Sequence, residues 1–162
     1  MTKIEWLGDD GPCVLLAQST AAGWVGSDGD DYEHACAALE DPAHAAVVPF
    51  EGGHALALET SGHQVALVRA EDGVIVVKWI FAPSETAAAR AVSVLGEDIA
   101  WRETGCSWTV PVSGVLLQAA GEAHGAESVP FDLRDGTYHV ATALFEPDSD
   151  SSFELFRLRR IG

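Results

Sequence analysis

The stretch VALVRAEDGVIVVKWIF, residues 65–81, decides the fold. Two runs rich in β-branched residues, 65–70 and 74–81, flank the turn sequence Glu71-Asp72-Gly73, and this pattern is typical of a β-hairpin. In the second run, alternate side chains point to opposite faces, and both faces are apolar apart from Lys78. A strand with two apolar faces lies in the interior of a sheet that is covered on both sides, so the stretch predicts a central strand.

The residues after this hairpin predict the longer of two helices, near residues 84–95. Ser84 is a good N-cap residue, Glu85 lies where the helix dipole favours a negative charge, and four alanines between residues 87 and 91 favour helix. Gly96 ends the pattern. The sequence therefore places a capped helix next to the central hairpin.

A shorter helix is predicted near residues 31–40. The helical segment is Tyr32–Leu39, with Asp30 or Asp31 as its cap, and Cys36 and Leu39 face inward at a spacing of three residues. Further strands are expected at 13–16, 45–48, 55–58, 99–102, 107–110, 115–118, 137–145 and 153–160, with the last two joined as a hairpin around residues 146–149. The expected class is α+β, with a mostly antiparallel β-sheet and about two helices.

Length and charge narrow the function classes. The 162 residues, 48% of them apolar, predict a single globular domain over residues 1–162. Nine Lys and Arg against 25 Asp and Glu give a formal net charge of −16, which repels nucleic acid and anionic membrane surfaces. Three well-separated cysteines suit reduced thiols in the cytoplasm, and no signal peptide or membrane span is expected. The oligomeric state is left open.

Catalytic motifs are missing from the sequence. It contains no nucleotide-binding glycine motif, no serine-hydrolase elbow and no metal-binding spacing of His and Cys, so we expect no enzyme, no cofactor and no metal. Asp28-Gly29-Asp30-Asp31 resembles the start of a calcium loop, yet Glu33 stands where the turn glycine belongs and Leu39 where the bidentate Glu belongs. A solvated, helix-capping acidic turn is the expected role of this segment.

The same segment is the candidate partner-binding site. Between Lys3 and Arg69 the chain has no Lys or Arg but eleven Asp and Glu residues. Trp24 stands between Gly23 and Val25-Gly26 just before the acidic turn, where it either anchors an interface or folds under its own loop. The residues assigned to the candidate partner-binding site are Trp24, Asp28, Asp30, Asp31 and Glu33.

Several blocks of the chain, in their order, resemble the bacterial immunity protein 21 family. The blocks are Gly11–Leu16 after Trp6, Trp24–Gly26, Asp31–Cys36, Ala55–Leu58, Val76–Ala82, Gly136–Val140, Glu146–Asp148 and Leu155–Leu158. The chain departs from the pattern at Cys13 and Ala17, where Leu and Pro are expected, and at residues 59–62, which replace an acidic turn containing Pro.

The resemblance implies a cytoplasmic protein of a polymorphic toxin system that binds and neutralises a cognate toxin. It implies no particular contact residues. The acidity suits toxins of the nuclease type, because an anionic inhibitor is steered to a cationic cleft and competes there with phosphate. The alternative function is a small-molecule-binding or hydrolytic α+β domain without a toxin partner, with a pocket between the sheet and the helix near residues 84–95.

Overall fold

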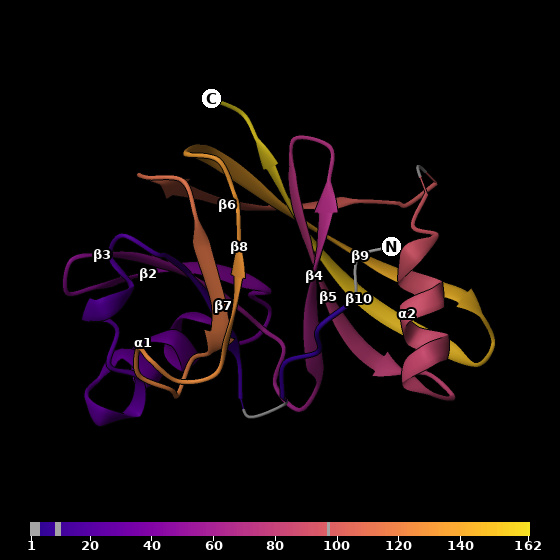
Figure 1. Cartoon of the computed structure of the whole chain (residues 1–162), viewed down its shortest axis with the longest axis horizontal. Helices are drawn as coiled ribbons and strands as arrows, with labels where there is room; N and C mark the ends of the chain where they lie inside the picture. Colours follow the sequence, from indigo (N-terminus) through magenta and orange to yellow (C-terminus); the bar gives the residue numbers. More distant parts are fainter. Residues whose placement is uncertain (1–3, 9–10, 97) are drawn as a thin grey trace.

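The computed structural model describes residues 4–8, 11–96 and 98–162 (Figure 1). Within these residues the chain forms ten strands, two α-helices and two short 3-10 helices. All strand pairs are antiparallel, so the expected α+β class with mostly antiparallel sheet is confirmed. The elements are β1 (Cys13–Ala17), η1 (Ala21–Gly23), η2 (Gly26–Asp28), α1 (Asp31–Ala38), β2 (Ala45–Phe50), β3 (Gly53–Leu58), β4 (Gln64–Ala70), β5 (Gly73–Phe81), α2 (Glu85–Ser93), β6 (Arg102–Val110), β7 (Val115–Ala119), β8 (Ser128–Phe131), β9 (Gly136–Asp148) and β10 (Ser151–Arg160).

The hairpin expected from residues 65–81 is β4–β5, and β5 is an inner strand of its sheet. This sheet, called the hairpin sheet below, has the strand order β4-β5-β10-β9-β6. Val74 and Val76 of β5 pack on one face, whereas Ile75 and Val77 pack on the other. The prediction of a central strand covered on both sides is therefore confirmed, because β5 pairs with β4 and β10 and buries both its faces.

The second sheet, called the β1 sheet below, has the order β2-β3-β1-β7-β8 and packs face to face with the hairpin sheet. Its strands also alternate: Leu15 of β1 points between the sheets, whereas Val14 and Leu16 point outward to the core beneath α1. On the far side, Phe153 and Leu155 of β10 pack under α2. The layers therefore follow the order α2, hairpin sheet, β1 sheet, α1 (Figure 1).

Two strand predictions need correction. The expected strand at 99–102 is wrong: Ile99–Trp101 is not strand, because the Trp101 amide donates to the nearby Ile99 carbonyl, 3.1 Å away, and β6 begins only at Arg102. From there β6 continues through the expected 107–110 strand, with a shift of register against β9 between Glu103 and Ser107. Strand β8 was not expected because Pro130 interrupts its short pattern, and the proline is tolerated since β8 is an edge strand.

The shorter helix also differs in its cap and its inward face. Helix α1 begins at Asp31, and the side chain of the N-cap residue Asp30 makes no capping hydrogen bond. Ala35 is fully buried at the centre of the inward face, with Leu39 buried just beyond the helix end and Cys36 only half-buried. The spacing argument identified Leu39 correctly but placed Cys36 deeper than it lies.

The longer helix allows a direct test of its predicted cap. Ser84 Oγ accepts a hydrogen bond from the Ala87 amide at 3.1 Å, as a helix N-cap should. We expect Ser84→Ala to lower the free energy of unfolding by about 1 kcal/mol, because this amide then loses its partner. Urea denaturation measures the change, and Thr86→Ala, an exposed site on the same helix, is the control with an expected change within about 0.5 kcal/mol. An equal loss of unfolding free energy in both variants would contradict the assignment of Ser84 as the N-cap.

Candidate functional site

The candidate site lies on the loop that connects β1 to α1 and on the first turn of α1, at the outer side of the β1 sheet (Figure 1). The loop passes through the two 3-10 helices before α1 begins. Of the five residues assigned to the site, Asp28, Asp30 and Glu33 are exposed, whereas Trp24 and Asp31 are buried. The five residues are therefore brought to one segment but not to one surface.

Trp24 is fully buried and holds the loop from inside. Its indole Nε1 donates to the Ala120 carbonyl at 3.0 Å, and its ring meets Phe50 edge-on with centroids 5.4 Å apart. Its own carbonyl accepts the His124 amide at 3.1 Å. Of the two roles that the sequence left open, the structure has the tryptophan folded under its own loop.

Asp31 also faces inward. One of its carboxylate oxygens accepts the Val25 amide at 2.8 Å, which ties the first residue of α1 back to the loop. This bond uses the carboxylate within the fold, so Asp31 contributes to the shape of the loop rather than to its exposed charge. The exposed carboxylates of the segment are those of Asp28, Asp30 and Glu33.

The loop rests on the connection between β7 and β8. The Ser27 amide and hydroxyl both donate to the Gly121 carbonyl, each at 3.0 Å. Gly26 has a positive φ of 56°, and a Cβ there would lie 2.5 Å from the Gly121 carbonyl oxygen, so this close approach requires glycine. The contact places exposed Glu122 beside the loop, and its carbonyl is held by the fully buried Gln118 through a 2.8 Å hydrogen bond.

Together Asp28, Asp30, Glu33 and Glu122 define the acidic loop surface. In the residues that the structure describes, none of these four carboxylates forms an ion pair with Lys, Arg or His. An unpaired group of like charges projects a negative potential into solvent, and this potential is strongest at low ionic strength. In the described residues the acidic loop surface therefore keeps its negative charge without a neighbouring cation to neutralise it.

Glu122 and Gln118 were missed by the sequence argument. A signal was present: Gln118 is a polar residue within the apolar run Val115–Ala120. Buried polar side chains need partners, so a glutamine at this position indicates a neighbouring loop to bind. That loop directly follows Gln118, whose partner is only four residues away. The β1–α1 loop that Glu122 lies beside is set by contacts with residues far away in sequence, and these could not be read from local sequence.

Two of the three cysteine thiols, which lie outside the candidate site in β1 and β6, have raised pKa values. Burial raises the pKa of the Cys13 thiol to about 12, and burial also raises the pKa of Cys106. Both shifts keep these thiols protonated near neutral pH, where only the thiolate is nucleophilic. Within the described ranges no three His, Cys, Asp or Glu side chains are grouped so that they could hold a metal ion.

The burial of Cys13 predicts a strong difference in thiol reactivity. In a Cys36→Ser/Cys106→Ser variant, Cys13 will react with a chromogenic disulfide reagent at pH 8 at least about a thousandfold more slowly than in urea, because reaction needs local opening. The variant that keeps only Cys36 is the control, since we expect this half-buried thiol to react in the native protein. Native reactivity of Cys13 equal to that of Cys36 would contradict the prediction.

The space between the hairpin sheet and α2, where the alternative function needed a pocket, is filled by core side chains. Ala88 and Val92 of α2 pack there on Ile75, Phe153 and Leu155. A groove of about 570 Å³ lies beyond this packed core. Its lining residues include the end of α2, the edge strand β4 and the edge strand β8. It is therefore a surface groove between elements and not a pocket under the helix.

Comparisons with known proteins give one match. The family model described as immunity protein 21 matches residues 5–151. No curated protein and no solved structure is similar enough to count as a match. Among the described residues, neither helix is long and apolar enough to cross a membrane.

Proposed function

Because the chain belongs to the immunity protein 21 family, we propose that it binds a cognate bacterial toxin in the cytoplasm and neutralises it by direct contact. The observation that carries this proposal is the match of the family model over residues 5–151 of the 162-residue chain. The family implies an immunity protein of a toxin system. The contact surface and the class of toxin are inferred from charge and geometry.

The acidic loop surface is the proposed contact. Its carboxylates are unpaired in the described structure, and the chain as a whole carries a formal charge of −16. A toxin that acts on nucleic acid binds phosphates through a cationic cleft, and the same cleft attracts this surface. The protein then blocks the cleft by occupying the place of the phosphate backbone, without any catalytic step.

The hydrogen bonds that hold this surface in place suit an inhibitor that associates rapidly with its target. The side chains of Trp24, Asp31 and Ser27 bind main-chain groups and so hold the loop in place, which positions its carboxylates before the toxin arrives. Preorganisation lowers the entropy cost of association, and long-range attraction raises the association rate. The proposed mode is therefore electrostatic capture by a preformed surface.

A growth experiment tests the function without assuming the contact surface. The toxin candidate encoded beside this gene is expressed alone and together with this protein, and both growth and co-purification are followed. We expect toxicity with the candidate alone, restored growth with both, and a stable complex. Toxicity that persists at full expression of this protein, with no complex recovered, would contradict the proposed function.

A further inference from the structure

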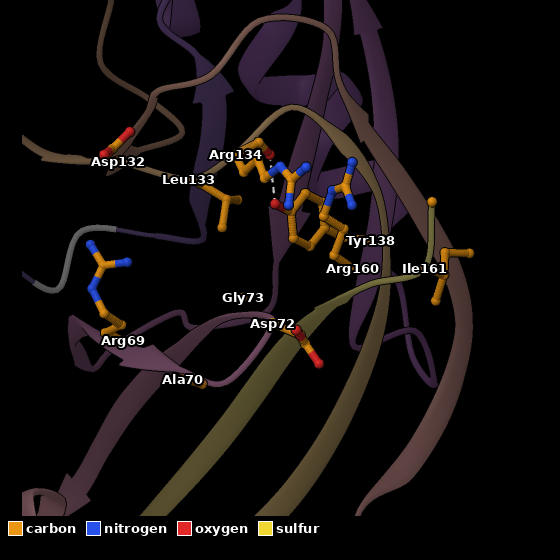
Figure 2. Close-up of a pocket in the computed structure, with 11 residues that line it drawn as sticks. Arg69, Ala70, Asp72, Gly73, Asp132, Leu133, Arg134, Tyr138, Arg160 and Ile161 are labelled. Atoms are coloured by element: carbon orange, nitrogen blue, oxygen red, sulfur yellow. Dashed lines mark hydrogen bonds between the residues drawn. The ribbon is translucent and has the colours of Figure 1, made fainter.

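A second charged feature lies in the hairpin sheet, where a cavity of about 460 Å³ opens beside the β4–β5 turn (Figure 2). Arg69, Arg134 and Arg160 line it, so one third of the nine Lys and Arg residues of the chain gather at this place. Leu133 and Tyr138 form its buried wall. The toxin binding proposed above, through the acidic loop surface, uses none of these residues.

The arginines are held by contacts that leave guanidinium nitrogens free. Arg160 Nε donates to the Asp135 carbonyl at 2.9 Å, while the Arg69 guanidinium lies over the Phe131 ring, 4.9 Å from its centroid. The Tyr138 hydroxyl donates to the Arg134 carbonyl and so fixes the main chain of that residue. Figure 2 shows the Arg134 and Arg160 side chains side by side next to the Tyr138 hydroxyl, with Arg69 across the cavity.

These cations lack carboxylate partners although the protein has a large excess of carboxylates. In the part of the chain that the structure describes, Arg69, Arg134 and Arg160 form no ion pair. Asp72 and Asp132 also line the cavity, yet both are exposed, and in Figure 2 the Asp72 carboxylate points away from the Arg134 and Arg160 pair. Guanidinium groups that form no ion pair keep N–H donors with which they can bind an anion.

We propose that this cavity binds an oxyanion, a phosphate or carboxylate group, between the guanidinium groups of Arg134 and Arg160, with Arg69 completing the site. Arginine suits this role because its planar fork matches two oxygens of a phosphate or carboxylate at once. The net charge of −16 repels small anions from the protein as a whole, so saturable anion binding would have to come from a local site. The proposal concerns the isolated protein and does not depend on a toxin partner.

Titration of the purified protein with potassium phosphate, and separately with potassium acetate, at constant ionic strength tests the site. The readout is the arginine Nε–Hε signals in NMR spectra. We expect the Arg160 signal to shift saturably with a dissociation constant on the order of 1 mM, the affinity that about two charge-assisted hydrogen bonds supply. Tighter binding of phosphate favours a phosphate group as the ligand class, and equal or tighter binding of the less charged acetate favours a carboxylate.

A charge-matched pair of variants separates the site from general charge effects. Arg69→Gln/Arg134→Gln removes two exposed cavity cations but keeps Arg160 and its hydrogen bond, and it should weaken binding at least about tenfold. Arg90→Gln/Arg102→Gln removes two exposed cations outside the cavity and should leave binding unchanged. Thermal unfolding confirms that both variants fold. The proposal would be overturned if neither anion produced a saturable shift, or if both double variants weakened anion binding to the same extent.

Discussion

Replacing Trp24 with alanine will lower the free energy of unfolding by about 3–5 kcal/mol, the usual range for deleting a fully buried large aromatic side chain. Trp24 has no exposed surface and packs with Phe50 in the core beneath α1. The substitution leaves a cavity there and also removes the indole donor to the Ala120 carbonyl. Both losses act on the segment that carries the acidic loop surface.

Chemical denaturation of two variants separates packing from hydrogen bonding at this position. Trp24→Phe keeps an aromatic ring but loses the indole N–H, so we expect a smaller loss of about 1–3 kcal/mol from the unsatisfied Ala120 carbonyl together with the reduced volume. Hydrogen exchange of residues 25–30 should become faster in the alanine variant than in the phenylalanine variant. A loss below about 1 kcal/mol for Trp24→Ala would contradict the role assigned to this side chain.

Reversing three charges of the acidic loop surface will slow association with the toxin by about 100-fold at low salt. The variant is Asp28→Lys/Asp30→Lys/Glu33→Lys, and its three positions are exposed, so the fold should be retained. The effect should shrink as salt is added, because the Debye length falls to about 8 Å at 0.15 M ionic strength. Stopped-flow mixing at several salt concentrations measures both the rate and its salt dependence.

A control with the same change in net charge is available in the β4–β5 turn, the segment after α2 and strand β9. Glu71→Lys/Asp98→Lys/Glu146→Lys also reverses three exposed carboxylates, at positions outside the acidic loop surface. Because steering depends mainly on charges near the contact, we expect a decrease of no more than about threefold for this control. Equal association rates for the two triple variants would show that only net charge matters and would remove the acidic loop surface as the contact.

Local sequence patterns predicted the elements whose conformation depends mainly on residues within the element itself. The β4–β5 hairpin follows from alternating apolar residues around Glu71-Asp72-Gly73, and α2 follows from the Ser84 cap and the alanines after it. These signals operate over a few residues, so no knowledge of distant contacts is needed. The family resemblance, carried by blocks along nearly the whole chain, was likewise confirmed.

Features that depend on distant partners could not be predicted in the same way. The sequence left two roles open for Trp24, because its burial depends on Ala120 and Phe50, which are far from it in sequence. The acidic loop surface includes Glu122 only because Gly26 and Ser27 meet Gly121. The arginine-lined cavity likewise needs three strands or loops to converge, since Arg69, Arg134 and Arg160 are scattered along the chain.

Hydrogen exchange of the purified complex with the toxin, compared with that of the free protein, tests most directly whether the acidic loop surface is the contact. The account predicts slower exchange on binding in residues 25–36 and 120–127, which form this surface and its support, with the β4–β5 turn at 71–73 unchanged. Slower exchange confined to other parts of the chain, with residues 25–36 and 120–127 exchanging as in the free protein, would contradict it.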